Sequence, residues 1–261
     1  YDKRTSDLLR ERNIAPSSGY DKMWVNDGEI RNRGIELTID GVAFQNRDWR
    51  VGGTFVFSRN RNKVLSLGNA VQTGLKTDLR TGMQYEYYGN QSEQFRAYTN
   101  ILAVGQPMYV FYGYRTDGIV QSLAEGLSAG LSGDDAQPGE FKYVDIYDGD
   151  GLETVDENDM CIIGDPNPDF IYGLTNTFTW KDLSLSIFIQ GSYGNDIFNV
   201  SRMETEGMYD GKNQSTEVLK RWRIPGQITN VPKANFNIKN STYFVEDGSY
   251  LRVKDISLSY N

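Results

Sequence analysis

The clearest pattern in the chain is an alternation of large apolar and small polar residues between Asp169 and Tyr193. Alternate side chains of a β-strand point to opposite faces, so this pattern predicts two strands that each have one apolar face. The short Lys181-Asp182 segment between them predicts a tight hairpin turn. The apolar positions are Phe170, Tyr172, Leu174, Phe178 and Trp180 before the turn and Leu183, Leu185, Ile187, Ile189 and Tyr193 after it.

A second hairpin is predicted around the short segment Asn46-Arg47-Asp48. Its apolar positions are Ile35, Leu37, Ile39 and Ala43, then Trp49, Val51, Phe55 and Phe57. Each run has about the 9–11 residues that a tilted strand needs to cross a bilayer. Trp49 and Trp180 flank the short turns, where an interfacial aromatic girdle would lie. The pattern favours a barrel with lipid outside and water inside, although core strands of a soluble β-sandwich alternate in the same way.

Long polar stretches separate these hairpins from the rest of the chain. They cover Arg10–Arg33, Asn60–Gln106, Ser122–Pro168 and Asn199–Gly248. Short turns at one end and long loops at the other are typical of outer-membrane barrels. Because both short turns lie at one end, we expect residues 60–168 to form an extracellular excursion, with a packed strand over Met108–Arg115. One short loop helix is predicted at Ser215–Arg223, capped by Ser215 or Thr216.

Composition removes several classes of function. The hydrophobic content is 38%, the mean hydropathy is −0.55, and no apolar run approaches the roughly 18 residues of a transmembrane helix. The net charge of −8, without a cluster of Lys and Arg, argues against nucleic-acid binding. With no histidine and one cysteine, Cys161, the chain cannot contain a Ser-His-Asp triad, a histidine zinc site or an internal disulfide. Cys161 is predicted to be a small apolar filler, and no catalytic residue is predicted.

An acidic, glycine-containing loop between Asp145 and Asp159 is the one constellation with metal chemistry. Its candidate calcium ligands are Asp145, Asp148, Asp150, Asp156 and Asp159. Calcium prefers six to eight oxygen ligands, which carboxylates in a glycine-rich loop can supply. Counting from Asp148, acids fall at positions one, three, nine and twelve of an EF-hand-like loop, but Glu153 replaces the turn glycine. A solvated acidic loop without calcium is the alternative.

Several sequence blocks occur in an order that is specific for one family. They are Tyr1–Leu9, Asn32–Leu37, Ser58–Val64, Gly105–Pro107 with Tyr112–Gly118, Ile163–Asp169 and Phe244–Leu258. In this order they resemble the C-terminal half of the barrel in SusC/RagA-type TonB-linked outer-membrane transporters of Bacteroidota. The family also has an Asp-rich loop just before its Ile-Gly-Asp-Pro block, and it fits here only with insertions.

The resemblance implies an all-β fold, part of a transmembrane barrel of about 22 antiparallel strands with long extracellular loops. It also implies nutrient import across the bacterial outer membrane, energised through the TonB complex and assisted by a SusD-like surface lipoprotein. The imported substrate would be an oligosaccharide or a peptide. The plug domain, TonB box and final strands of the family have no counterpart in residues 1–261, so we expect the chain to be a fragment.

Two other classes of function stay open at this point. The first is a secreted β-sandwich that binds glycans through Tyr85, Tyr87 and Tyr88, with calcium in the acidic loop. The second is a glycoside hydrolase that uses a pair of carboxylates, although nothing in the sequence marks such a pair. The Tyr85–Tyr88 cluster is more typical of loop packing than of a sugar-binding platform. No substrate-binding residue can be assigned from the sequence.

Overall fold

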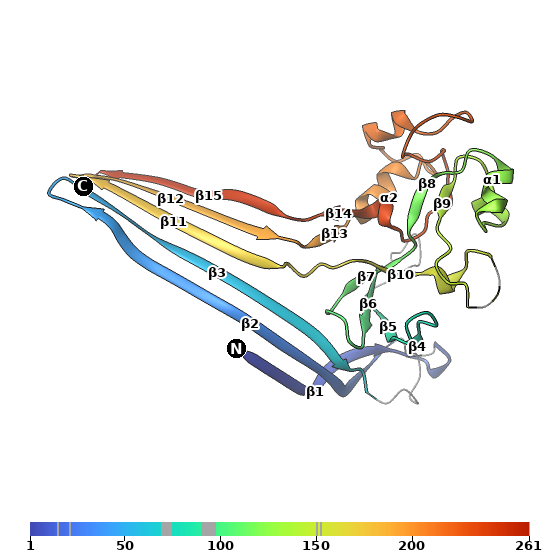
Figure 1. Ribbon diagram of the computed structural model, residues 1–261, viewed down its shortest axis with the longest axis horizontal. Coiled ribbons are helices and arrows are strands. Elements are labelled where there is room, and N and C mark those ends of the chain that lie inside the picture. Colours follow the sequence, from blue (N-terminus) through green and yellow to red (C-terminus); the bar gives the residue numbers. More distant parts are fainter. Residues whose placement is uncertain are drawn as a thin grey trace.

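The computed structural model describes residues 1–14, 16–20, 22–68, 75–89, 98–149, 151 and 153–260. A long antiparallel sheet forms one end of the molecule, and a lobe of short strands, helices and loops forms the other (Figure 1). We call this lobe, residues 67–169 and 194–249, the head.

Six strands make up the long sheet, in the spatial order β1-β2-β3-β11-β12-β15. Their bounds are Asp2–Asn13 (β1), Lys22–Gln45 (β2), Trp49–Ser66 (β3), Phe170–Trp180 (β11), Leu183–Tyr193 (β12) and Tyr250–Tyr260 (β15). Both predicted hairpins are confirmed, since β2 pairs with β3 and β11 pairs with β12. Lys181 takes a left-handed φ of 50° in the short β11–β12 turn.

The first three strands extend further than the alternation predicts. The interpretation of Arg10–Arg33 as a loop is wrong, because most of it belongs to β1 and β2. This part of the sheet is held by cross-strand ion pairs, including Arg31–Asp2 at 2.5 Å and Lys22–Glu11 at 3.3 Å. A ribbon with polar groups on both faces has no apolar stripe, so its sequence looks like a loop.

A register shift corrects one position of the apolar face. The β2–β3 pairing slips between Val42 and Phe44, which places Phe44 opposite Val51. Phe44, and not Ala43, therefore shares the face of Val51, because paired residues of neighbouring strands point to the same side.

The head contains the remaining elements. Its strands are Lys76–Thr77 (β4), Gln84–Tyr88 (β5), Asn100–Ala103 (β6), Val110–Gly113 (β7), Thr116–Ile119 (β8), Phe141–Tyr143 (β9), Cys161–Gly164 (β10), Asp196–Phe198 (β13) and Val245–Asp247 (β14). Its helices are Leu123–Ser128 (α1), Val200–Glu206 (α2), and the 3-10 turns Gly133–Ala136 (η2), Glu157–Asp159 (η3), Thr216–Lys220 (η4) and Thr242–Phe244 (η5). A further 3-10 turn, Pro16–Ser18 (η1), joins β1 to β2.

The buried core of the molecule lies in the head. Its largest cluster includes Phe141, Tyr143, Met203 and Phe244, each at most 2% exposed. The predicted packed strand is confirmed as β7, whose Phe111 joins this cluster while its Val110 and Tyr112 join a second one. Cys161 is buried at the start of β10, as expected for an apolar filler, and burial raises the pKa of its thiol.

The connections between sheet strands are unequal at the two ends of the sheet. The β2–β3 and β11–β12 turns are short, whereas the segments 67–169 and 194–249 leave from the opposite end and build the head (Figure 1). β3 pairs directly with β11, so no described strand between them in the sequence joins the long sheet. The predicted loop helix is present as η4, with the Ser215 side chain accepting from Glu217 N.

Within the described ranges, no helix combines the length and the apolar character that crossing a bilayer requires.

Candidate functional site

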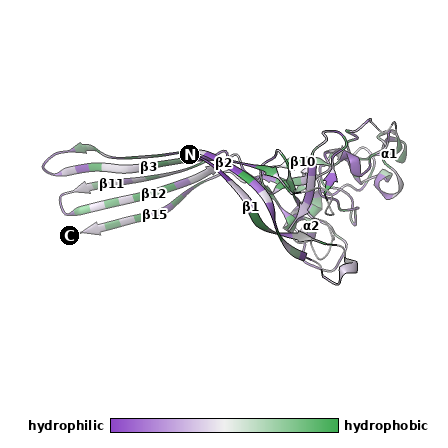
Figure 2. Cartoon of the chain, turned by 90° about the horizontal axis from the view of Figure 1, so that it is seen from below, coloured by the Kyte–Doolittle hydropathy of each residue, from purple (hydrophilic) through white to green (hydrophobic). Residues whose placement is uncertain are grey.

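One face of the long sheet is apolar across five neighbouring strands. The pairing register places on this face Ile35, Leu37, Ile39 and Phe44 of β2, Trp49, Val51, Phe55 and Phe57 of β3, Phe170, Tyr172, Leu174, Phe178 and Trp180 of β11, Leu183, Leu185, Ile187 and Ile189 of β12, and Leu251, Val253, Ile256 and Leu258 of β15. No other described element covers this face (Figures 1 and 2). Ile35, Ile256 and Leu258 are about two-thirds exposed (67%, 65% and 68%).

Such a surface needs an apolar environment. Soluble monomers rarely expose contiguous apolar patches above roughly 600 Å². A β-sandwich would cover its apolar face with a second sheet about 10 Å away, and the described residues contain no such sheet. The sandwich alternative is therefore wrong.

Aromatic residues border the apolar face at both ends. Trp49 and Trp180 are directly paired, with ring centroids 6.0 Å apart and each ring about 45% exposed (44% and 45%). At the head end, Phe170 stacks on Tyr193 at 5.2 Å and contacts Phe57 at 5.6 Å. The turn-side girdle was predicted, but the head-side girdle was not.

The spacing of the two girdles matches a membrane. Phe170 and Trp180 are the two ends of β11, whose 11 residues span about 33 Å at roughly 3.3 Å per residue. A strand tilt of about 40° shortens this to about 25 Å, the height of the apolar band of outer-membrane barrels.

The opposite face of the sheet is mostly polar. Thr54 Oγ1 donates to Asp40 Oδ1 at 2.6 Å, and Ser184 Oγ bonds to Thr179 Oγ1 at 3.1 Å. Phe188 is an exception, paired with Thr175. A sheet with one apolar face and one hydrated face separates lipid from a water-filled lumen.

The acidic loop of the head is organised around Asp159, which is 1% exposed. Its Oδ1 accepts from the backbone N–H groups of Ile146 (2.7 Å) and Tyr147 (3.0 Å), and its Oδ2 accepts from Asp156 N (2.7 Å). Asp156 Oδ1 accepts from Asn158 N at 2.6 Å and caps η3. These two carboxylates thus serve as caps for the backbone.

The other candidate ligands differ from this pair. Asp145 lies beside Asp159, and burial together with that neighbouring charge raises the pKa of the Asp145 carboxyl. Its Oδ1 is buried and accepts no hydrogen bond from the described residues. Asp148 is exposed, and Asp150 lies outside the described residues. The described acids do not converge as a set of three ligands, and calcium binding stays a prediction.

The tyrosines considered as a sugar platform pack inside the head. Tyr85 is 6% exposed and contacts Tyr112 with ring centroids 4.9 Å apart. Tyr88 packs against Tyr109 at 4.7 Å, and burial raises the pKa of Tyr87 to about 12. Their rings contribute to packing in the head.

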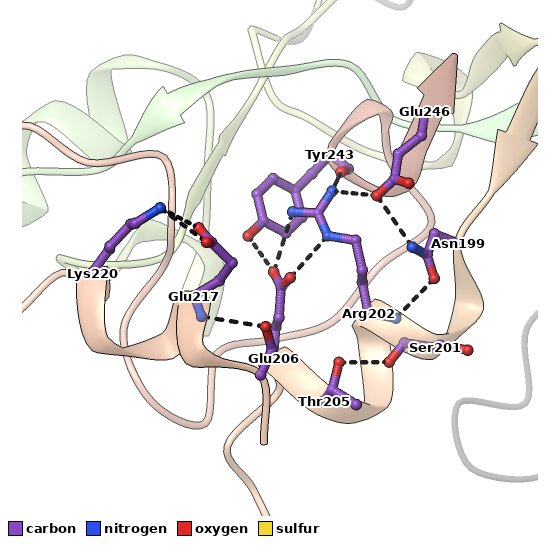
Figure 3. A network of polar contacts seen from close by, with 10 residues as sticks. Asn199, Ser201, Arg202, Thr205, Glu206, Glu217, Lys220, Tyr243 and Glu246 are labelled. Atoms are coloured by element: carbon purple, nitrogen blue, oxygen red, sulfur yellow. Dashed lines mark hydrogen bonds and ion pairs between the residues drawn. The ribbon is translucent and has the colours of Figure 1, made fainter. Parts of the chain in front are cut away.

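A buried polar network that the sequence analysis missed fixes the loop between β12 and β15 (Figure 3). Arg202 of α2 donates to both carboxylate oxygens of Glu206, at 2.9 and 3.2 Å, and also to the Tyr243 carbonyl at 2.8 Å. The Tyr243 hydroxyl donates to Glu206 at 2.5 Å, and the Arg202 guanidinium lies 4.2 Å from the Tyr243 ring centroid. The spacing of four residues between Arg202 and Glu206 was the available signal.

The chain aligns over its whole length with known receptors. TonB-dependent receptor P3 of Formosa agariphila is 33% identical over 264 residues, which cover 100% of this chain and 24% of that protein. TonB-dependent receptor SusC of Bacteroides thetaiotaomicron is 23% identical over 270 residues, which cover 100% of this chain and 23% of that protein. The chain belongs to the SusC/RagA-type TonB-dependent receptors. No protein-family model matches it.

Solved structures show the fold of this receptor chain. The RagAB peptide transporter matches it with a TM-score of 0.74 and 23% sequence identity, over 99% of this chain and 26% of that chain. RagAB in its open-open state matches with a TM-score of 0.69, over 99% of this chain and 25% of that chain, at 22% identity. The predicted fold class, part of a large antiparallel barrel with long loops, is confirmed.

The receptor chain spans about a quarter of the length of its relatives (24% and 25%). SusC/RagA-type TonB-dependent receptors are outer-membrane proteins, so the predicted location in the bacterial outer membrane is confirmed. The relatives are receptors rather than enzymes, and the prediction that the chain is not an enzyme is confirmed as well.

Proposed function

We propose that this chain forms part of the barrel wall and of the extracellular loops in an active importer of oligosaccharides or peptides. Import would be energised through TonB, by a part of the protein outside residues 1–261. The main support for this proposal is the apolar face that runs across five strands and is bounded by aromatic residues at each end.

The unequal lengths of the connections indicate which end of the sheet faces the outside of the cell. Outer-membrane barrels have short periplasmic turns and long extracellular loops. On this basis the β2–β3 and β11–β12 turns face the periplasm, and the head faces the outside. We therefore propose that residues 60–168 include an extracellular excursion, of which 67–168 belong to the head.

A SusD-like surface lipoprotein is the proposed partner on the outer side. The loop after α2 exposes three aliphatic residues, Leu219 (69%), Ile224 (65%) and Ile228 (101%). Gln227 holds this loop compact, because its side chain accepts from Arg223 N at 2.8 Å and donates to the Arg221 carbonyl at 3.0 Å. Exposed aliphatic groups on a fixed loop can enter an apolar pocket of a partner.

Co-purification of the lipoprotein with the full-length receptor tests this assignment. A triple substitution Leu219→Ser, Ile224→Ser, Ile228→Ser should reduce the amount of co-purified lipoprotein without unfolding the barrel. The matched control is Leu123→Ser with Leu127→Ser, which removes exposed leucines from α1 and should leave the complex intact. Equal yields from the triple variant and the wild type would contradict the assignment of this loop.

We also propose that the acidic loop binds calcium, and one carboxylate oxygen supports this. The buried Oδ1 of Asp145 faces no donor among the described residues, and calcium prefers such carboxylate oxygens. The ligand set proposed is Asp145, Asp148, Asp150, Asp156 and Asp159.

A further inference from the structure

A cavity of about 630 Å³ opens in the head. It lies between the β4–β5 turn and the start of β10, and its lining includes Asp78, Arg80, Gln106, Arg115 and Cys161. The five-stranded sheet of the head has β4 at one edge and β10 at the other. Lys76 Nζ of β4 and Glu157 Oε2 of η3, just before β10, lie 3.7 Å apart, so this sheet curls and brings its two edges together beside the cavity.

The walls of the cavity are held by backbone hydrogen bonds. Asp78 Oδ1 accepts from Arg80 N at 2.9 Å and from Thr81 N at 3.0 Å, and Asp78 O accepts from Gly82 N at 2.7 Å. Gly82 has a φ of +71°, which favours glycine at this turn. On the other side, the Arg115 carbonyl accepts from Val144 N at 3.0 Å. The backbones of both arginines are thus held in place, and no described residue accepts a hydrogen bond from either guanidinium group.

The charges in the cavity are incompletely paired. The Arg115 side chain makes no hydrogen bond or ion pair with any described residue. Arg80 Nη2 lies 3.7 Å from Asp78 Oδ2, which is too long for a hydrogen bond. Asp78 Oδ2 is itself buried and accepts no hydrogen bond from the described part of the chain. Both guanidinium groups also act on the buried Cys161 thiol, since their positive charges oppose the rise in its pKa that burial causes.

Guanidinium groups whose N–H donors are not used in hydrogen bonds are suited to anions. Arginine presents a planar set of donors that matches a carboxylate, and such charge-assisted hydrogen bonds are among the strongest in proteins. The cavity volume of about 630 Å³ exceeds what a carboxylate alone fills, and leaves room for a sugar ring. Thr81 and Gln106 add hydroxyl and amide groups that can bond to ring hydroxyls.

We propose that this cavity binds an acidic sugar, with Arg80 and Arg115 holding its carboxylate and Thr81 and Gln106 contacting its hydroxyls. Asp78 has the opposite effect: its negative charge competes with the ligand for Arg80 and weakens binding. The assignment deepens the proposed function, on which it rests for the role of the sugar as part of an imported substrate.

The test measures binding of glucuronate to the full-length receptor in detergent by isothermal titration calorimetry. Arg80→Gln and Arg115→Gln should each weaken binding about tenfold, because each removes one charged hydrogen-bond partner. Asp78→Asn keeps the turn-capping oxygen and removes the competing charge, so it should tighten binding roughly three- to tenfold. Arg223→Gln, which changes an exposed arginine of the loop after α2, is the matched control and should leave the affinity unchanged.

Chemical labelling of Cys161, the single cysteine of this chain, gives a second readout at the cavity itself. Glucuronate should slow its reaction with a small methanethiosulfonate reagent, followed by mass spectrometry of the Cys161 peptide. Neutral glucose should not slow it, and glucuronate should lose its effect in the Arg80→Gln, Arg115→Gln double variant.

Unchanged affinity in both arginine variants, or weaker binding in Asp78→Asn, would overturn the assignment. Tighter binding of N-acetylglutamate than of glucuronate would overturn the choice of a sugar and indicate an acidic peptide. Neither experiment involves transport, so a failure here leaves the proposed import function standing, and a failure of import leaves a binding result intact.

Discussion

The network around Arg202 should determine how firmly the loop between β12 and β15 is held. Glu206 is 2% exposed, and its carboxylate is neutralised by both donors of the Arg202 fork. Arg202→Met removes the positive charge and keeps much of the apolar stem. The buried carboxylate would then keep only the Tyr243 hydroxyl as a described partner.

The size of the effect follows from the burial of Glu206. Removing one partner of a buried ion pair costs about 3–5 kcal/mol, because an uncompensated charge stays inside the protein. Because the hydrogen bond from Tyr243 remains, we expect Arg202→Met to cost about 3 kcal/mol, the lower end of this range. This corresponds to a roughly hundredfold larger equilibrium constant for opening of the loop. Glu246 also loses Arg202, at 3.2 Å, but its side chain is 44% exposed and its loss adds little.

Hydrogen–deuterium exchange of the full-length receptor measures this opening directly. Peptides covering α2 and β14 should exchange about a hundredfold faster in Arg202→Met, whereas β11 and β12 should be unchanged. The double variant Arg202→Met, Glu206→Met removes both charges, so its exchange should return close to the wild-type rate. A change below fivefold in Arg202→Met, or faster exchange in the double variant than in the single one, would refute this reasoning.

Two further predictions concern the sheet and the acidic loop. Ile187→Arg places a charge near the middle of the apolar face of β12 and should lower the stability of the barrel by about 2–4 kcal/mol, whereas Ser186→Arg on the polar face should have little effect. Heat-modifiability on gels compares the two variants, and equal losses of stability would contradict the face assignment. Because the pKa of the Asp145 carboxyl is raised in the folded protein, the folded loop binds the proton of this carboxyl more tightly than the unfolded loop does. Protease protection of residues 149–159 should therefore be complete below the ordinary pKa of 3.8 and should fall as the pH rises through the raised pKa of Asp145. Added calcium should restore that protection at pH 7, and the double variant Asp150→Asn, Asp156→Asn should abolish the restoration. If neither pH nor a calcium chelator changes the protection, the loop is a solvated one without calcium.

The sequence predicts the hairpins of the sheet well because their physical pattern is local. Along β11 and β12, large apolar side chains alternate with small polar ones, apart from Ile171, Asn176 and Phe188, so period two is visible without any knowledge of the fold. Trp49 and Trp180 are directly paired at the turn end of the apolar face, the position predicted for them from the sequence.

Other strands are invisible to this pattern for identifiable reasons. β1 and the first half of β2 mix polar and apolar side chains on both faces and are held by ion pairs such as Arg31–Asp2. In β15 the alternation is broken, because the register with β12 shifts between Phe188 and Ile189 and moves Val253 and Ile256 out of a single period of two. Such bulges are set by pairing with a neighbour, which a single strand's sequence does not reveal.

The candidate sites likewise differ in whether a local sequence pattern or contacts between distant segments create them. The acidic loop is visible as a sequence motif, but the roles of Asp156 and Asp159 as backbone caps depend on the turn that they stabilise. Arg80 and Arg115 come from separate segments and line one cavity because the head sheet curls. Their proximity therefore could not be predicted from spacing in the sequence.

The exposure of the sheet to lipid is the central claim, and site-directed spin labelling tests it most directly. In the full-length receptor in lipid bilayers, labels are attached one at a time to two sets of positions. The apolar set is Leu185, Ile187, Phe55 and Phe57, and the polar set is Ser184, Ser186 and Thr54. The structure predicts that oxygen, which concentrates in lipid, relaxes the first set more strongly, and that a water-soluble nickel chelate relaxes the second. Equal accessibility of the two sets to both reagents would contradict the membrane-barrel account.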